Sequence, residues 1–123
     1  MNTAESALRA ALTDAMRARD KTATSVLRTT IGALGNAEAV TTTAVPPVSS
    51  SEHVAGAHVG LGAAEAARRE LTDAEAWAVV RAEADDLVRS ADALDASGRP
   101  DRAAELRSEA VVLHDVLRRT VVD

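Results

Sequence analysis

Two apolar seams near the C-terminus dominate the pattern of this sequence. The first seam, with alternating spacings of three and four residues, consists of Trp77, Val80, Ala84, Leu87, Ala91 and Leu94. The second has the same kind of spacing and consists of Ala103, Leu106, Ala110, Leu113 and Leu117. Because this spacing keeps apolar side chains on one face of an α-helix, the seams predict two long helices that pack against each other.

Signals for helix ends surround the two seams. Thr72 and Glu75 have the spacing of a capping box, in which each side chain accepts a hydrogen bond from the backbone of the other residue. Gly98 follows the first seam as a C-cap signal, and Pro100 suits the first turn of a new helix. Residues 65–123 are therefore predicted to form an antiparallel helical hairpin.

The composition limits the core that these helices can build. The 123 residues include 28 Ala but no Phe or Tyr, and Trp77 is the only aromatic residue. We interpret Trp77 as a core anchor rather than as part of a binding surface, because it heads the first seam. Burial of a Leu or Val contributes about 1.5–3 kcal/mol, so a core of Leu and Val over Ala predicts ordinary stability. One expectation is therefore a homo-oligomer, because a second copy of the chain would cover further apolar surface.

Residues 1–40 are predicted to form a pair of helices. Thr3 is the expected N-cap of the first helix, and Asp20 is the expected break and second cap. The apolar stripes are Leu8, Leu12 and Met16 in the first helix and Leu27, Ile31 and Leu34 in the second. Gly32 and Gly35 suggest a place where another helix packs close. With no strand pattern anywhere, the predicted fold class is all-α, a small helical bundle.

Residues 41–64 separate the helix pair from the hairpin. They are rich in Thr, Ser, Pro and Gly and show no periodicity, so we predict a mobile linker within a single domain. The linker contains three candidate residues, Glu52, His53 and Gly56. Catalysis by a Ser51–His53 pair would need a third group that orients the base, and metal binding would need a third fixed ligand; neither is evident. No catalytic residue, metal site or cofactor is predicted.

Charge and composition exclude several classes of protein. The net charge is −5, with 14 Lys and Arg residues against 19 Asp and Glu, which argues against an autonomous, strongly cationic nucleic-acid-binding protein. The absence of Cys excludes a disulfide scaffold. No apolar run approaches the roughly 20 residues of a membrane helix, and the start of the chain does not resemble a signal peptide. We therefore expect a cytoplasmic protein with no membrane association.

The positive charges of the first 40 residues include one candidate group. Arg17, Lys21 and Arg28 would fall within about 40° of each other on a continuous helix, given its period of 3.6 residues. They are candidate contacts for the phosphates of tRNA. The alternative is that they are solvated residues paired with nearby carboxylates.

The order of short motifs resembles the GatB/YqeY family. These motifs are Leu12-x-x-Ala15-Met16-x-x-x-Asp20-Lys21, Ser25-Val26-Leu27-Arg28, Asn36-x-Glu38, the run from Glu70 to Glu75, and Gly98-Arg99-x-Asp101-x-Ala103-x-Glu105, continued by Glu109 and Leu113. The family comprises small bacterial helical proteins of the YqeY type and the tail domain of the B subunit of glutamyl/aspartyl-tRNA amidotransferase. The segment 51–56 is similar to an insertion in actinobacterial members, and the Ala- and Arg-rich composition suits that source.

The resemblance implies a helical domain associated with tRNA-dependent amidation. The family label is a carbon–nitrogen ligase with glutamine as amide donor, but the tail domain helps to hold tRNA while other domains perform the reaction. YqeY-type members continue into a second small domain after a Leu-Pro step; here the corresponding residues are Leu117 and Arg118, so that domain is not expected.

The leading hypothesis is a non-catalytic accessory module that docks tRNA or an enzyme that handles aminoacyl-tRNA. The first alternative is a protein-interaction bundle with no role in nucleic-acid binding, whose acidic hairpin faces a basic partner. The second alternative is an enzyme that works through the loop around His53.

Overall fold

The computed structural model describes residues 2–43 and 70–122. These residues form the helices α1 (Thr3–Ala18), α2 (Lys21–Thr43), α4 (Asp73–Ala96) and α5 (Pro100–Val122). The described residues contain no strand, which confirms the all-α prediction. Apart from the last three residues of α2, the predicted linker and its candidates Glu52, His53 and Gly56 lie outside the described residues.

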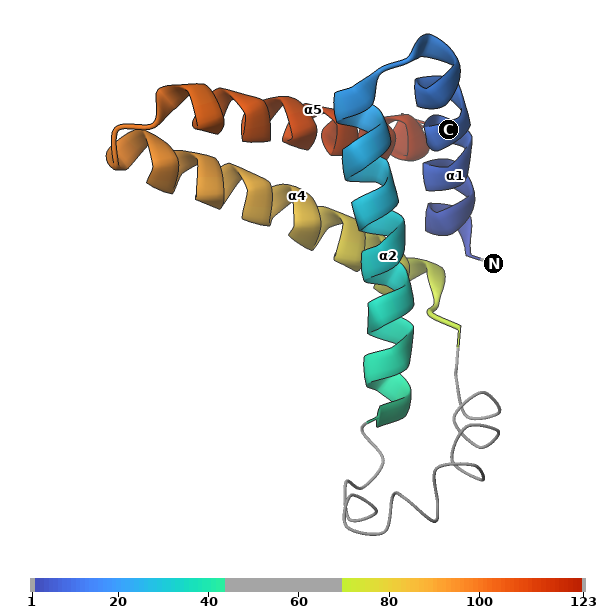
Figure 1. The fold of residues 1–123 in the computed structure, drawn as a ribbon. Helices are drawn as coiled ribbons and strands as arrows, with labels where there is room; N and C mark the ends of the chain where they lie inside the picture. Colours follow the sequence, from blue (N-terminus) through green and yellow to red (C-terminus); the bar gives the residue numbers. More distant parts are fainter. Residues whose placement is uncertain (1, 44–69, 123) are drawn as a thin grey trace, which may run out of the picture.

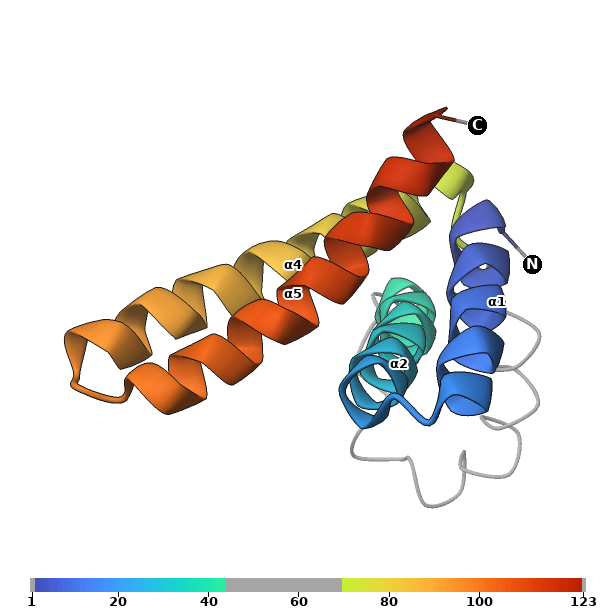
Figure 2. The same ribbon diagram turned by 90° about the horizontal axis from the view of Figure 1, so that it is seen from above.

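The hairpin predicted from the two seams is present and is the longest feature of the molecule. Helices α4 and α5 run antiparallel along their whole length, while α1 and α2 pack against one end of the pair (Figure 1). Figure 2 shows that α1 and α2 lie on the same side of that end. The hairpin turn therefore projects away from the other two helices.

The core consists of two apolar clusters that meet at Leu87. The larger cluster joins all four helices and includes the fully buried side chains of Leu8, Leu27, Val80 and Leu113. The smaller cluster contains Ala91, Ala103 and Leu106, with Leu87 and Leu94 packed against it. We call residues 88–109, which surround this smaller cluster, the hairpin arm. Its core is built mainly from Ala, so its helices approach closely but bury little area per residue.

The helix ends of the hairpin match the predicted signals. The Thr72 hydroxyl accepts a hydrogen bond from the backbone N–H of Glu75 at 3.1 Å, and the Glu75 carboxylate accepts one from the N–H of Thr72 at 2.8 Å. Gly98 has a φ of +82°, and the Arg99 N–H donates to the carbonyl of Leu94 at 2.8 Å. This six-residue closure is a Schellman motif, in which the left-handed residue is usually Gly.

Trp77 lies at the edge of the larger cluster, where it joins α4 to α1. Its side chain is partly buried, while the neighbouring Ala76 is fully buried. The indole N–H of Trp77 donates to the hydroxyl of Thr3 at 2.9 Å, and the backbone N–H of Thr3 donates to Asp73 at 2.8 Å. A tryptophan at a rim can combine apolar packing with a hydrogen bond from its ring nitrogen.

Three expectations for the N-terminal helices need correction. Asn2, not Thr3, is the N-cap of α1, and its side chain accepts from the backbone N–H of Glu5 at 2.8 Å. Met16 does not continue the buried stripe, because its side chain is 50% exposed while Ala15 is buried. Gly32 does not mark a close helix contact, since a Cβ atom built there would meet nothing within 4 Å.

Two surface ion pairs of the hairpin join residues of the same helix. Among the described residues, Asp86 pairs with Arg89 and Asp115 with Arg118, each three positions apart. Both pairs are exposed, so their contribution to stability is small.

None of the described helices is both long and apolar enough to cross a membrane.

Candidate functional site

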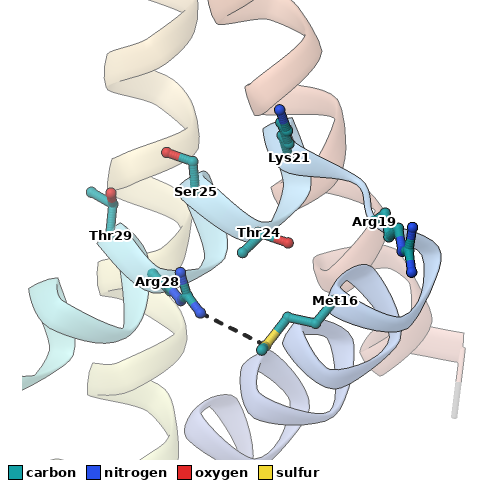
Figure 3. A pocket seen from close by; sticks show the side chains of 7 residues that line it. All are labelled: Met16, Arg19, Lys21, Thr24, Ser25, Arg28 and Thr29. Carbon is teal, nitrogen blue, oxygen red and sulfur yellow. Dashed lines mark hydrogen bonds between the residues drawn. The ribbon is translucent and has the colours of Figure 1, made fainter.

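An open pocket lies where the chain turns from α1 into α2. Its volume is about 680 Å³. It is lined by Met16, Arg19, Lys21, Thr24, Ser25, Arg28 and Thr29 (Figure 3). Three of these side chains are cationic, three carry hydroxyl groups, and none is acidic. The pocket is therefore locally basic in a protein whose net charge is −5.

The turn that shapes this pocket forces Arg19 into a left-handed conformation. Its φ is 57° and its ψ is 37°, and it is the only described residue other than Gly with a positive φ. The Asp20 N–H closes the end of α1 on the carbonyl of Ala15 at 2.9 Å, as Arg99 does on Leu94 at the hairpin turn. The same Schellman motif thus occurs twice, with Gly at one turn and Arg at the other.

An Arg side chain at this position is costly for the backbone. The left-handed conformation brings Cβ close to the following carbonyl oxygen, which costs roughly 1–2 kcal/mol in residues other than Gly. Strained backbone of this kind is found preferentially at functional sites. The strain at Arg19 therefore gives a physical reason to regard the pocket as a functional site.

The one acidic residue of the turn, Asp20, does not line the pocket. The Asp20 carboxylate accepts a hydrogen bond from the backbone N–H of Ala23 at 3.0 Å, which makes Asp20 the N-cap of α2, as predicted. Asp20 also lines a second, smaller pocket of about 260 Å³, together with Asp14 and Asp115. Asp20 thus places a negative charge between Arg19 and Lys21 in the sequence, although its side chain is not part of the basic pocket's lining.

Met16 and Arg28 close one side of the pocket. Arg28 Nη2 lies 3.9 Å from the sulfur of Met16, and the two side chains point toward one another across the gap between α1 and α2 (Figure 3). Lys21, Ser25 and Thr29 follow along α2 at intervals of four residues, so they share one face of that helix. The pocket thus combines a hydroxyl-rich row with an apolar, polarizable thioether.

The structure brings together two of the three predicted cations. Lys21 and Arg28 line the pocket, whereas Arg17 does not and lies on the last turn of α1. The reason is that α1 and α2 are separate helices, so the angular positions of one continuous helix do not apply. Arg19 was missed by the sequence reasoning; the signal was a cation directly before the predicted break at Asp20.

The other charged clusters of the described residues offer no comparable site. Arg107 bridges the two helices of the hairpin arm, with its guanidinium 2.8 Å from Asp92 and 2.6 Å from Asp95. The hydrogen bonds to Asp92 and then Asp95 raise the pKa of Arg107 above its usual value. This exposed network holds two carboxylates and one guanidinium, so it offers no excess positive charge. No group of three or more His, Cys, Asp or Glu side chains within residues 2–43 and 70–122 could hold a metal ion.

Comparison with known proteins identifies no relative. No family model, no curated protein and no solved structure matches the chain.

Proposed function

We propose that this protein is a GatB/YqeY-like helical module without a catalytic role, which docks on tRNA in the cytoplasm. In this proposal the positive charges of Arg19, Lys21 and Arg28 lie close to phosphate groups of the tRNA, and another protein performs the tRNA-dependent amidation. The proposal of family rests on the order and spacing of the short motifs in α1, α2 and the hairpin.

The observation that carries the docking proposal is the basic pocket at the turn between α1 and α2. Phosphate contacts supply most of the affinity of nucleic-acid-binding proteins, and Arg and Lys are their usual donors. The strained backbone of Arg19 supports the same conclusion, because a Gly would be better tolerated there if the side chain had no role.

The test is the salt dependence of tRNA binding, measured by fluorescence anisotropy. With three phosphate contacts, the logarithm of the association constant should fall against the logarithm of salt concentration with a slope of roughly −2 to −3. Lys21→Ala and Arg28→Ala should each weaken binding and reduce the magnitude of the slope by about 1.

Arg102→Ala is the matched control. It removes the same charge from an exposed position, 55% accessible and paired with Glu105 at 2.6 Å, at the far end of the molecule. It should leave the slope unchanged. Equal losses in all three variants would show a nonspecific charge effect, and no retention of tRNA at low salt would reject the docking function.

Light scattering in the same buffer would test whether a homo-oligomer forms.

A further inference from the structure

We infer that the basic pocket holds one unstacked nucleotide of a single-stranded RNA segment, with its phosphate at Arg19 and Lys21 and its base against Met16 and Arg28. This inference rests on the proposed function and specifies which part of the RNA the pocket recognises. A surface for duplex phosphates would need only exposed cations. This pocket has, in addition, a site for a flat ring.

The ring site is the pair formed by Met16 and Arg28. A thioether makes favourable contacts with aromatic rings, and a guanidinium plane stacks on nucleobases. Met16 is half exposed although its neighbour Ala15 is buried, so its side chain is available to a ligand. The contact of 3.9 Å between Met16 and Arg28 places both groups at the same side of the pocket.

The phosphate site is at the other end of the lining. Lys21 is the first residue of α2, and Arg19 is the C-cap of α1, two residues before it. Lys21 and Arg28 are seven residues apart, which corresponds to about 10 Å along a helix. This separation gives a phosphate and its base distinct places along α2, with Thr24 and Ser25 between Lys21 and Arg28 in the sequence.

The size of the pocket fits this occupant. A volume of about 680 Å³ is large for a phosphate ion alone. It falls in the range of roughly 300–1,000 Å³ that is typical of sites for small organic molecules. The A-form duplex offers no unstacked base to fill it, whereas loops and single-stranded ends do.

The experiment compares adenosine 5′-monophosphate with ribose 5-phosphate, which has the same phosphate but no base. Binding to the full chain is measured by isothermal titration calorimetry at low salt, with chemical shift mapping of the pocket residues. Adenosine 5′-monophosphate should bind more tightly. Met16→Ala should weaken its binding about fivefold, the effect expected for loss of a sulfur–aromatic contact, and should leave ribose 5-phosphate unaffected.

Arg28→Lys is the second variant, because it keeps the charge but loses the guanidinium plane. It should reduce the ratio of the affinity for adenosine 5′-monophosphate to the affinity for ribose 5-phosphate, because Lys supplies a charge but no plane on which a base can stack. Both residues are exposed, so the variants should fold, and circular dichroism checks that they do.

The possible results separate the inference from the proposed function. Equal affinity for the two ligands, with tRNA still retained, would overturn the nucleotide pocket but leave tRNA docking in place. Unchanged nucleotide binding in both variants would also overturn it. Nucleotide binding without retention of tRNA would support the pocket and reject the docking function.

Discussion

At the scale of single residues, the two left-handed turns show how differently the chain treats the same backbone geometry. Gly98 closes the hairpin turn with a φ of +82°, and Arg19 closes α1 with a φ of 57°. Both turns contain the six-residue hydrogen bond of a Schellman motif. Gly has no Cβ to strain at such a turn, so Arg19 carries a conformational cost that Gly98 avoids.

Arg19→Gly should therefore stabilise the protein while weakening its binding of tRNA. Relief of a left-handed Cβ is worth roughly 1–2 kcal/mol, and the greater freedom of Gly in the unfolded chain offsets about half of it. We expect the free energy of unfolding to rise by about 0.5–1 kcal/mol in urea denaturation. Arg19→Ala is the control, since it removes the same charge but keeps the strain. A gain of stability in Arg19→Ala as well would contradict the explanation.

At the scale of helices, local periodicity determined most of the fold but not its details. The spacing within the two seams depends only on residues of the same helix, and it correctly predicted the hairpin. The phase of the α1 stripe was wrong at Met16, because Ala15 and Met16 are both apolar and only the neighbouring helix decides which is buried. The basic pocket could not be predicted as a whole, since it requires the angle between α1 and α2.

Helix α2 contains a glycine, Gly32, at a position where a larger residue should stabilise the helix. Gly32 is exposed, helical and surrounded by open space, so a Cβ atom would be accommodated without contact. Gly32→Ala should raise the free energy of unfolding by about 0.5–1 kcal/mol, through the higher helix propensity of Ala. Thermal unfolding followed by circular dichroism would measure the change. Gly98→Ala, at a positive φ, should lower stability instead; a gain there would be inconsistent with the turn geometry.

At the scale of the whole molecule, a small set of contacts orients α1 against the hairpin. Thr3 accepts from the Trp77 ring nitrogen, 74 residues away in the sequence, and donates its backbone N–H to Asp73, 70 residues away. These contacts join the first turn of α1 to the first turns of α4. No local sequence pattern predicts these contacts, because their partners are far apart in the sequence. The sequence therefore predicted Trp77 as a core anchor but did not predict its hydrogen bond to Thr3.

Trp77→Phe tests how much the hydrogen bond between Trp77 and Thr3 contributes to stability. The substitution keeps most of the apolar ring but loses the N–H donor, so we expect a loss of about 0.5–1.5 kcal/mol in the free energy of unfolding. Thr3→Val removes the acceptor with little change in shape. In a double-mutant cycle the two losses should not add, because both variants break the same hydrogen bond. Fully additive losses would show that the bond contributes nothing.

The regular repeat of the hairpin arm means that its length can be changed in fixed steps. Its two helices contact each other through seams that repeat about every seven residues, and the smaller cluster shares only Leu87 with the larger one. Deleting one such repeat from each helix would draw the tip inward by about 10 Å while keeping the same faces in contact. A partner bound at the tip would then lie closer to α1 and α2, and each further deletion would shorten that distance by the same step.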